Sequence, residues 1–162
     1  MADETAGYVL FRLGPEMYGL PVEKVQSIIR YERGTPVPRA PEGVEGVINL
    51  RGRIIPVVDL SMRLGRGTFE PETTSRVVVA EGEAGPVGLA VDAASEVAWI
   101  AVDAIKPPPE AAISAETADA ITGVAEYGGN LVVLIDLDKA VPRAAYASPT
   151  DSRIPEEGMS DG

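Results

Sequence analysis

Residues 44–60 read VEGVINLRGRIIPVVDL: two short apolar runs flank Arg51-Gly52, and the second run ends at Asp59. Short runs rich in β-branched residues around a glycine-containing turn predict a β-hairpin, in which Gly52 supplies the positive φ of a tight turn. Asp59 is a favourable N-cap for a short helix over residues 60–64. This stretch therefore predicts a strand–turn–strand–helix unit.

The same pattern recurs 77 positions later, at residues 121–137, which read ITGVAEYGGNLVVLIDL. Upstream, an offset of 69 positions aligns Val22 with Val91 and Ile28 with Val97. The difference between the two offsets means that the second copy is eight residues longer. A chain with this self-similarity contains two copies of one hairpin-rich unit of about 70 residues.

The repeated unit predicts an all-β fold with short helices. A small sheet of about five strands leaves its edges open unless it curls into a barrel. One barrel of this size buries little apolar surface, so two should pack together. We predict a single domain over residues 1–142 made of two small β-barrels side by side, with about 8–66 as the first lobe and about 75–142 as the second. Residues 143–162, which contain several Pro and Gly, are expected to form a loose tail.

Composition excludes several classes of function. The 162-residue chain contains no His and no Cys, which rules out Ser-His-Asp and Cys-His catalysis, thiolate metal sites and disulfides. Its formal net charge of −11 disfavours nucleic acid as a partner. No apolar run approaches the roughly 18 residues that cross a membrane, and the acidic N-terminus is unlike a signal peptide. We expect a soluble cytoplasmic protein with no catalytic residue, no cofactor, no bound metal and no direct membrane insertion.

The charge is unevenly distributed along the chain. Residues 12–66 contain nine basic and six acidic side chains, whereas residues 67–162 contain five basic and 17 acidic ones. A salty habitat or a high-GC coding bias accounts equally well for the overall acidity. The asymmetry predicts lobes of opposite sign, which would associate head to tail.

Two aspartate patterns have structural explanations. Asp59, after an apolar strand, resembles the phospho-accepting site of response-regulator receiver domains. Receivers also need an acidic pair after the first strand and long helices between strands, whereas this chain has hairpins. Asp136 and Asp138 could bind a divalent cation, but two carboxylates are a weak signal, and Asp136 fits the N-cap of a short helix.

Four segments together resemble one family. They are residues 18–26 (YGLPVEKVQ), 35–38 (TPVP), 46–52 (GVINLRG) and 55–60 (IPVVDL). In this order they are similar to the signature of the CheW family, the chemotaxis coupling proteins, over about residues 8–142. The resemblance implies two SH3-like five-stranded barrels, in agreement with the repeat. One departure is Ser27, where family members often carry an acid, so the ion pair expected there is in doubt.

The resemblance implies a non-catalytic adaptor. Family members join the cytoplasmic tips of methyl-accepting chemoreceptors to the regulatory domain of the histidine kinase CheA, and they alternate with that domain head to tail in rings. The implied location is the cytoplasm, at receptor arrays on the inner face of the membrane. Because the adaptor would hold receptor and kinase together, a receptor shift would change the stability of the active kinase arrangement.

The resemblance also implies protein-binding residues. Val25 and Arg51 match family positions implicated in partner binding, and a guanidinium on an exposed turn can pair with carboxylates of a partner. A receptor groove is expected between the lobes. The residues that would form its apolar seam for a receptor helix are Val22, Ile28, Val91 and Val97. Core packing is an equal alternative for these four, and a solvated turn is an alternative for Arg51.

Two other functions stay open. A paralogue of the same fold could serve a separate pathway, such as type IV pilus or gliding control, or block array assembly by competition. A small-ligand binding protein would need polar anchors in a concave apolar site, and the sequence shows no obvious ones. The resemblance favours the coupling adaptor over both.

Overall fold

Ten β-strands form two five-stranded sheets in the part of the chain that the computed structural model describes, residues 4–108 and 118–141. The sheets have the orders β8-β1-β2-β10-β9 and β3-β6-β7-β5-β4. The strands are β1 (Thr5–Leu13), β2 (Glu16–Pro21), β3 (Val25–Arg30), β4 (Val44–Leu50), β5 (Arg53–Asp59), β6 (Arg76–Gly82), β7 (Gly85–Val91), β8 (Ala93–Ala101), β9 (Ile121–Tyr127) and β10 (Asn130–Ile135). The short helices are α1 (Leu60–Arg63) and α2 (Leu137–Ala140), with 3₁₀ turns at Val22–Lys24, Val102–Ala104 and Ala118–Ala120.

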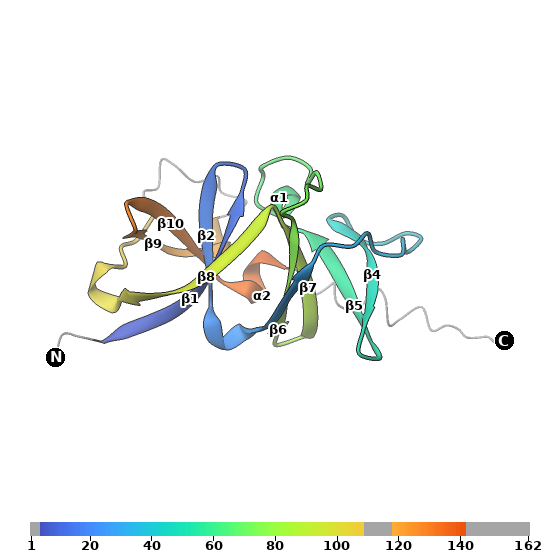
Figure 1. Ribbon diagram of the computed structural model, residues 1–162, viewed down its shortest axis with the longest axis horizontal. Coiled ribbons are helices and arrows are strands. Elements are labelled where there is room, and N and C mark those ends of the chain that lie inside the picture. Colours follow the sequence, from blue (N-terminus) through green and yellow to red (C-terminus); the bar gives the residue numbers. More distant parts are fainter. Residues whose placement is uncertain (1–3, 109–117, 142–162) are drawn as a thin grey trace.

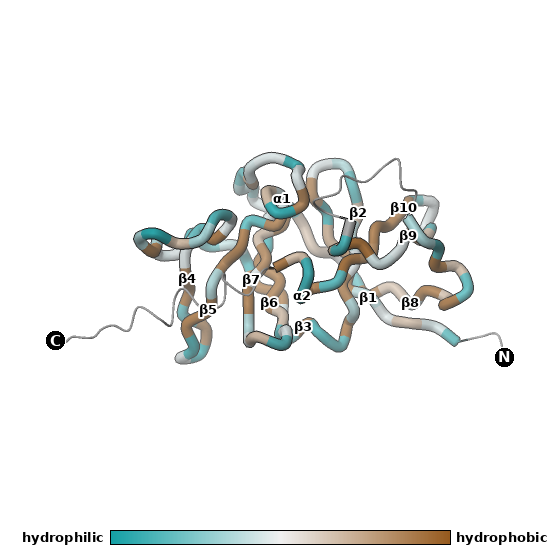
Figure 2. The backbone as a smooth tube through the Cα atoms, turned by 180° about the vertical axis from the view of Figure 1, so that it is seen from behind, coloured by the Kyte–Doolittle hydropathy of each residue, from teal (hydrophilic) through white to brown (hydrophobic). Residues whose placement is uncertain are grey.

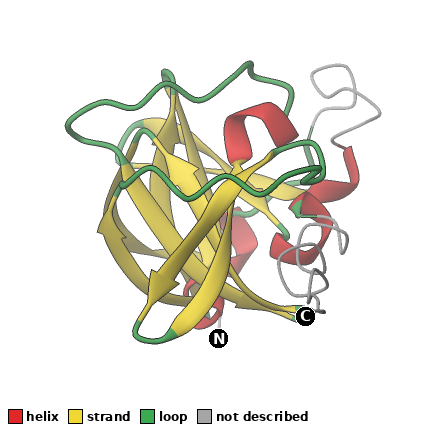
Figure 3. Ribbon diagram, turned by 90° about the vertical axis from the view of Figure 1, so that its right-hand side faces the viewer, coloured by secondary structure: helices red, strands yellow, loops and turns green. Residues whose placement is uncertain are grey.

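The predicted fold class is confirmed. Each sheet curls into a small SH3-like barrel, and the two barrels lie side by side, with α2 seen between them (Figure 1). Figure 3, turned by 90° from that view, shows the strands wrapping around one another. None of the described helices is long and apolar enough to cross a membrane. The predicted tail, 143–162, lies outside the described residues.

The predicted lobe boundaries, 8–66 and 75–142, are wrong because the two repeats exchange strands. β1 and β2 come from the first repeat, yet they pair with β8 and β10 of the second. β6 and β7 come from the second repeat and pair with β3 and β5 of the first. The first lobe therefore consists of β1, β2, β8, β9 and β10, and the second lobe of β3 to β7, residues 22–91.

The repeat itself is confirmed by matching hydrogen bonds in the two lobes. Thr35 and Val47 exchange backbone bonds of 2.8 and 2.9 Å, and Lys106 and Val124 exchange two of 2.8 Å. Val47 and Val124 are the residues that the offset of 77 aligns. Each lobe also contains one parallel pairing, of β5 with β7 and of β10 with β2.

Both predicted helix caps are confirmed. A carboxylate oxygen of Asp59 accepts a hydrogen bond from the backbone N–H of Met62 at 3.0 Å, at the start of α1. Asp136 accepts the equivalent bond from Lys139 at 3.1 Å, at the start of α2. These bonds satisfy N–H groups that have no partner within the helix.

One core continues from the first lobe into the second. Along β1, Leu10 fills the first barrel, whereas Phe11 packs between the lobes. Along β6, Val77 and Val79 fill the second barrel, whereas Val78 packs between the lobes. Strands buried on both faces have nearly continuous apolar sequences, which Figure 2 shows as brown segments along β6 and β7. The lobes are therefore one structural unit.

Candidate protein-binding surface

Two edge strands carry exposed aliphatic side chains at equivalent places. β3 is an edge of the second sheet and β8 an edge of the first. Ile28 of β3 lies opposite the buried Val78, and Val97 of β8 lies opposite the buried Val9. Ile28 is 42% exposed and Val97 is 43% exposed. In each lobe, one exposed aliphatic side chain thus lies on the face of the edge strand that is turned toward the shared core.

Trp99 extends this surface, and sequence reasoning missed it. It follows Val97 by two residues on the same face of β8, opposite Gly7 of β1. A Cβ atom added at Gly7 would lie 2.7 Å from the indole and 3.0 Å from Val22, so the ring covers the glycine beside Val22. Trp99 is nevertheless 62% exposed. The alternating sequence VAWIA at 97–101 was the available signal. We call the face formed by Val22, Ile28, Val97 and Trp99 the interlobe surface.

The prediction that Val91 lines a groove is wrong. Val91 is fully buried at the end of β7, in the core that the lobes share. It aligns with Val22 in the repeat, but Val22 lies in a 3₁₀ turn and is half-buried, whereas Val91 continues a central strand. Val25 is also half-buried and packs against the shared core. The other three predicted seam residues, Val22, Ile28 and Val97, are half-buried or exposed and stay candidates for the seam.

Arg51 lies elsewhere, at the tip of the β4–β5 hairpin. It has φ +56° and Gly52 has φ +86°, the signs that a two-residue type I′ turn requires. The side-chain oxygen of Asn49 accepts a hydrogen bond from the N–H of Gly52 at 3.0 Å. Arg51 is exposed and forms no ion pair with the described acids. Its guanidinium is held on a defined turn and points into solvent.

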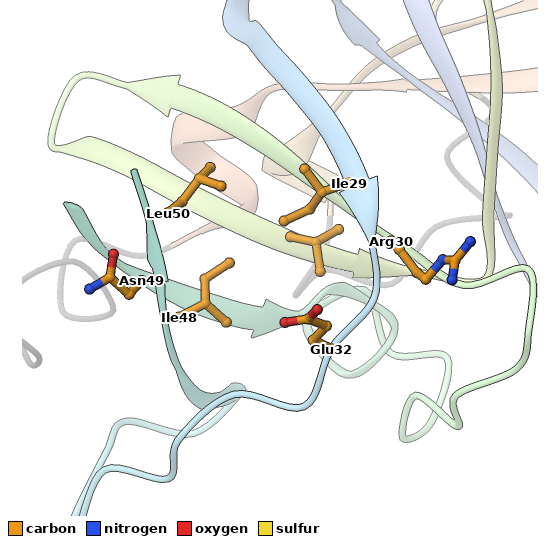
Figure 4. A pocket seen from close by; sticks show the side chains of 7 residues that line it. Ile29, Arg30, Glu32, Ile48, Asn49 and Leu50 are labelled. Carbon is orange, nitrogen blue, oxygen red and sulfur yellow. The ribbon is translucent and has the colours of Figure 1, made fainter. Parts of the chain in front are cut away.

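A cavity of about 260 Å³ lies next to this hairpin, at the opening between β3 and β4. These strands are the two ends of the second sheet and are not neighbours in it. The lining side chains, shown in Figure 4, are four aliphatic and three polar ones: Ile29, Ile48, Leu50, Val77, Arg30, Glu32 and Asn49. Because Leu50 lines the cavity and directly precedes Arg51, the cavity and the Arg51 guanidinium lie at the same end of the second lobe.

Two acids, the half-buried Glu45 and the buried Asp59, support the loops of the second lobe. The hydroxyl of Tyr31 donates a hydrogen bond to Glu45 at 2.6 Å. The pKa of Glu45 is raised above its ordinary value, mainly by burial and further by the negative charge of Asp59. The hydrogen bond from Tyr31 offsets part of this increase. Asp59 is 5% exposed and accepts a second backbone bond, from Phe69 at 2.9 Å, besides the cap. These carboxylates have backbone or hydroxyl donors as partners, which indicates a structural role.

Strand exchange also changes the predicted charge distribution. The second lobe, residues 22–91, contains nine basic and nine acidic side chains. The described part of the first lobe, residues 4–21, 92–108 and 118–141, contains three basic and nine acidic ones. The lobes are therefore neutral and acidic, rather than opposite in sign.

Two SH3-like barrels with a common core and exposed apolar strand faces define a protein-interaction module of the tandem-barrel class. Residues 7–145 match the family model described as CheW-like domain. This chain therefore belongs to the CheW-like domain family.

Relatives match over most of their length. The protein named chemotaxis protein CheW of Klebsiella aerogenes is 35% identical over 142 residues, 86% of this chain and 84% of the relative. The crystal structure of the scaffolding protein TtCheW from Thermoanaerobacter tengcongensis has 34% identity and a TM-score of 0.76, over 85% of this chain and 88% of that one. Protein FrzA of Myxococcus xanthus is 32% identical over 123 residues, 76% of either chain. The chain is thus a homologue of chemotaxis scaffold proteins.

Proposed function

We propose that this chain is a non-catalytic adaptor that joins methyl-accepting chemoreceptors to a CheA-type histidine kinase. The interlobe surface binds a receptor helix, and the Arg51 end of the second lobe binds the regulatory domain of the kinase. The main support is the contiguous apolar face of Val97 and Trp99, because exposed apolar residues that cluster indicate a binding site more strongly than scattered ones. Similarity to a chemotaxis protein and to a scaffolding protein supports a role in holding other proteins together. The proposed partners are those that the family resemblance implies.

Coupling follows from the shared core. A receptor shift that changes the fit at the interlobe surface changes the free energy of the complex that also holds the kinase. Coupling energies between two sites are typically about 1–3 kcal/mol, and the effect is reciprocal, so kinase binding also changes receptor affinity. No reaction on the adaptor is needed.

The proposed place of action is the cytoplasm, at receptor arrays on the inner face of the membrane. In the arrays the adaptor contacts kinase regulatory domains head to tail. A neutral and an acidic lobe attract each other more weakly than lobes of opposite sign would, so apolar contacts carry more of this association.

A second candidate is a paralogue that serves another pathway, and the similarity to Protein FrzA favours keeping it. Small-ligand binding is less well supported. The cavity beside β3 and β4 has about 260 Å³, below the roughly 300–1,000 Å³ of ligand pockets.

The test uses the full chain with a receptor cytoplasmic fragment and a kinase regulatory domain from the same genome. We expect each to bind in titration calorimetry and all three to co-elute in gel filtration. Val97→Asp should abolish receptor binding and spare the kinase. Arg51→Ala should weaken kinase binding about tenfold and spare the receptor. Leu131→Asp is a matched control, because Leu131 is 59% exposed on β10, which is separated from β8 by two strands and belongs to a different sheet from the Arg51 hairpin. Binding to neither partner would refute the proposal, and binding only to the partners of another pathway would favour the paralogue.

A further inference from the structure

The two lobes present different chemistry at equivalent positions of the interlobe surface. The offset that aligns the repeats places Arg30 of β3 at the position of Trp99 of β8. In the structure Trp99 lies opposite Gly7, and Arg30 lies opposite Arg76. The same place thus has an indole over a glycine in one lobe and two arginines at paired positions of neighbouring strands in the other.

The basic end lacks a partner for its charge. Arg30 is exposed, and Figure 4 shows its side chain extending away from the aliphatic residues of the cavity. Arg76 donates hydrogen bonds to the carbonyls of Ser75 at 2.9 Å and Thr73 at 3.4 Å. Across the ranges that the structure describes, neither arginine forms an ion pair with an acid. Like charges on neighbouring strands repel, so an acidic group from a partner would relieve this repulsion.

The aromatic end is suited to an apolar contact. The indole of Trp99 lies over Gly7, and Val22 is next to the same glycine, while Trp99 stays largely exposed. Tryptophans in such positions are enriched among the residues that contribute most to protein interfaces. Between the two ends, Ile28 and Val97 are almost equally exposed and chemically alike.

We propose that the interlobe surface binds an amphipathic helix in one direction only. A large apolar side chain of the helix contacts Trp99, aliphatic side chains cover Ile28 and Val97, and acidic side chains meet Arg30 and Arg76. This inference rests on the proposed function, since the helix is the receptor's, and it adds the orientation and the residues that fix it. A helix fits because the surface offers side chains on strand faces, which an apolar stripe can cover. Ile28 and Val97 alone would accept the helix in either direction, so the chemically different ends of the surface determine its direction.

The chain's composition allows a direct test. Trp99 is its single tryptophan, so its fluorescence reports on this site alone. We expect titration with a tryptophan-free receptor cytoplasmic fragment from the same genome to shift the emission to shorter wavelength and to reduce quenching by acrylamide. Trp99→Ala should weaken binding about thirtyfold. Arg30→Glu should weaken it about tenfold, and less at high salt.

Matched variants control for folding and net charge. Leu131→Ala removes an exposed apolar side chain from the same lobe as Trp99, and Arg39→Glu makes the same charge change as Arg30→Glu in an exposed loop. Both should bind as the wild type, and melting curves should show all variants folded. Because the chain has no Cys, Arg30→Cys gives a single cross-linking site. It should cross-link to cysteines at the acidic end of the receptor helix.

The outcomes separate this inference from the proposed function. Receptor binding without a shift in Trp99 emission, or with equal cross-linking of Arg30→Cys to both ends of the helix, would overturn the orientation and leave the adaptor role intact. An emission shift with the kinase regulatory domain, and none with the receptor, would assign the surface to the other partner and overturn the inference. Failure of the fragment to bind at all would refute receptor coupling and this inference with it.

Discussion

Replacing Arg51 with Asn separates the stability of the β4–β5 turn from its use in binding. Arg51 has φ +56°. This left-handed conformation costs a non-glycine residue about 1–2 kcal/mol, and Asn tolerates it better. The hydrogen bond from Gly52 to Asn49 does not involve the Arg51 side chain, so the turn should remain. We expect Arg51→Asn to raise the free energy of unfolding by about 0.5 kcal/mol and Tm by about 1–2 °C.

The same substitution should weaken binding of the kinase regulatory domain about tenfold, because it removes a charge-assisted hydrogen bond of about 1.5 kcal/mol. Thermal unfolding followed by circular dichroism and titration calorimetry measure the two effects. Arg39, also exposed and at φ +61°, provides the matched control: Arg39→Asn should stabilise equally and leave binding unchanged. Wild-type affinity of Arg51→Asn would show that Arg51 is a solvated turn residue. A lower Tm would refute the reasoning about the turn.

Three further predictions concern stability. Val91→Ala should lower the free energy of unfolding in urea by about 2 kcal/mol, because it leaves a cavity in the shared core. The folded variant should bind the receptor fragment as the wild type does. Loss of binding by folded protein would show that Val91 takes part in binding. Asp59→Ala should cost about 2–4 kcal/mol, since the N–H groups of Met62 and Phe69 both lose their acceptor, and a Tm unchanged from wild type would contradict this. Glu45 has a raised pKa, so the folded state holds its proton more tightly than the unfolded state, and stability falls as pH rises from the unfolded value of about 4.3 through the folded one. Glu45→Gln should therefore have a higher free energy of unfolding than the wild type at pH 7, and this difference should disappear near pH 4. If urea unfolding gives the same difference at pH 7 and at pH 4, the pKa of Glu45 is not raised.

Local structure was predictable because short-range chemistry determines it. The Arg51-Gly52 turn and the helix caps at Asp59 and Asp136 depend on a few adjacent residues, and all three are present. Strand partners depend on distant parts of the chain. A repeat shows that two units are alike, but it is silent on whether each unit pairs with itself, so the lobe boundaries were wrong.

The proposed binding surface was predictable only in part, for a related reason. Ile28 and Val97 were found because the repeat aligns them, and the alignment also selected Val91, which is buried. Alignment transfers sequence position, whereas exposure depends on what packs above a strand. Trp99 was missed because the repeat pairs it with Arg30, a residue of unlike chemistry. A search for alternation along one strand, without the repeat, would have placed Trp99 beside Val97.

Strand exchange means that a partner bound at the proposed interlobe surface would act on both lobes. The described chain passes from the first lobe to the second between β2 and β3, at Val22–Lys24, and returns between β7 and β8, at Asp92. The first crossing lies beside Trp99, and the second directly follows Val91, which pairs with Arg76. Both ends of the interlobe surface therefore adjoin a covalent link between the lobes. A helix bound at this proposed site would contact the places where the backbone must change if one lobe moves against the other. Its position would therefore influence the proposed kinase-binding end without unfolding any part of the core.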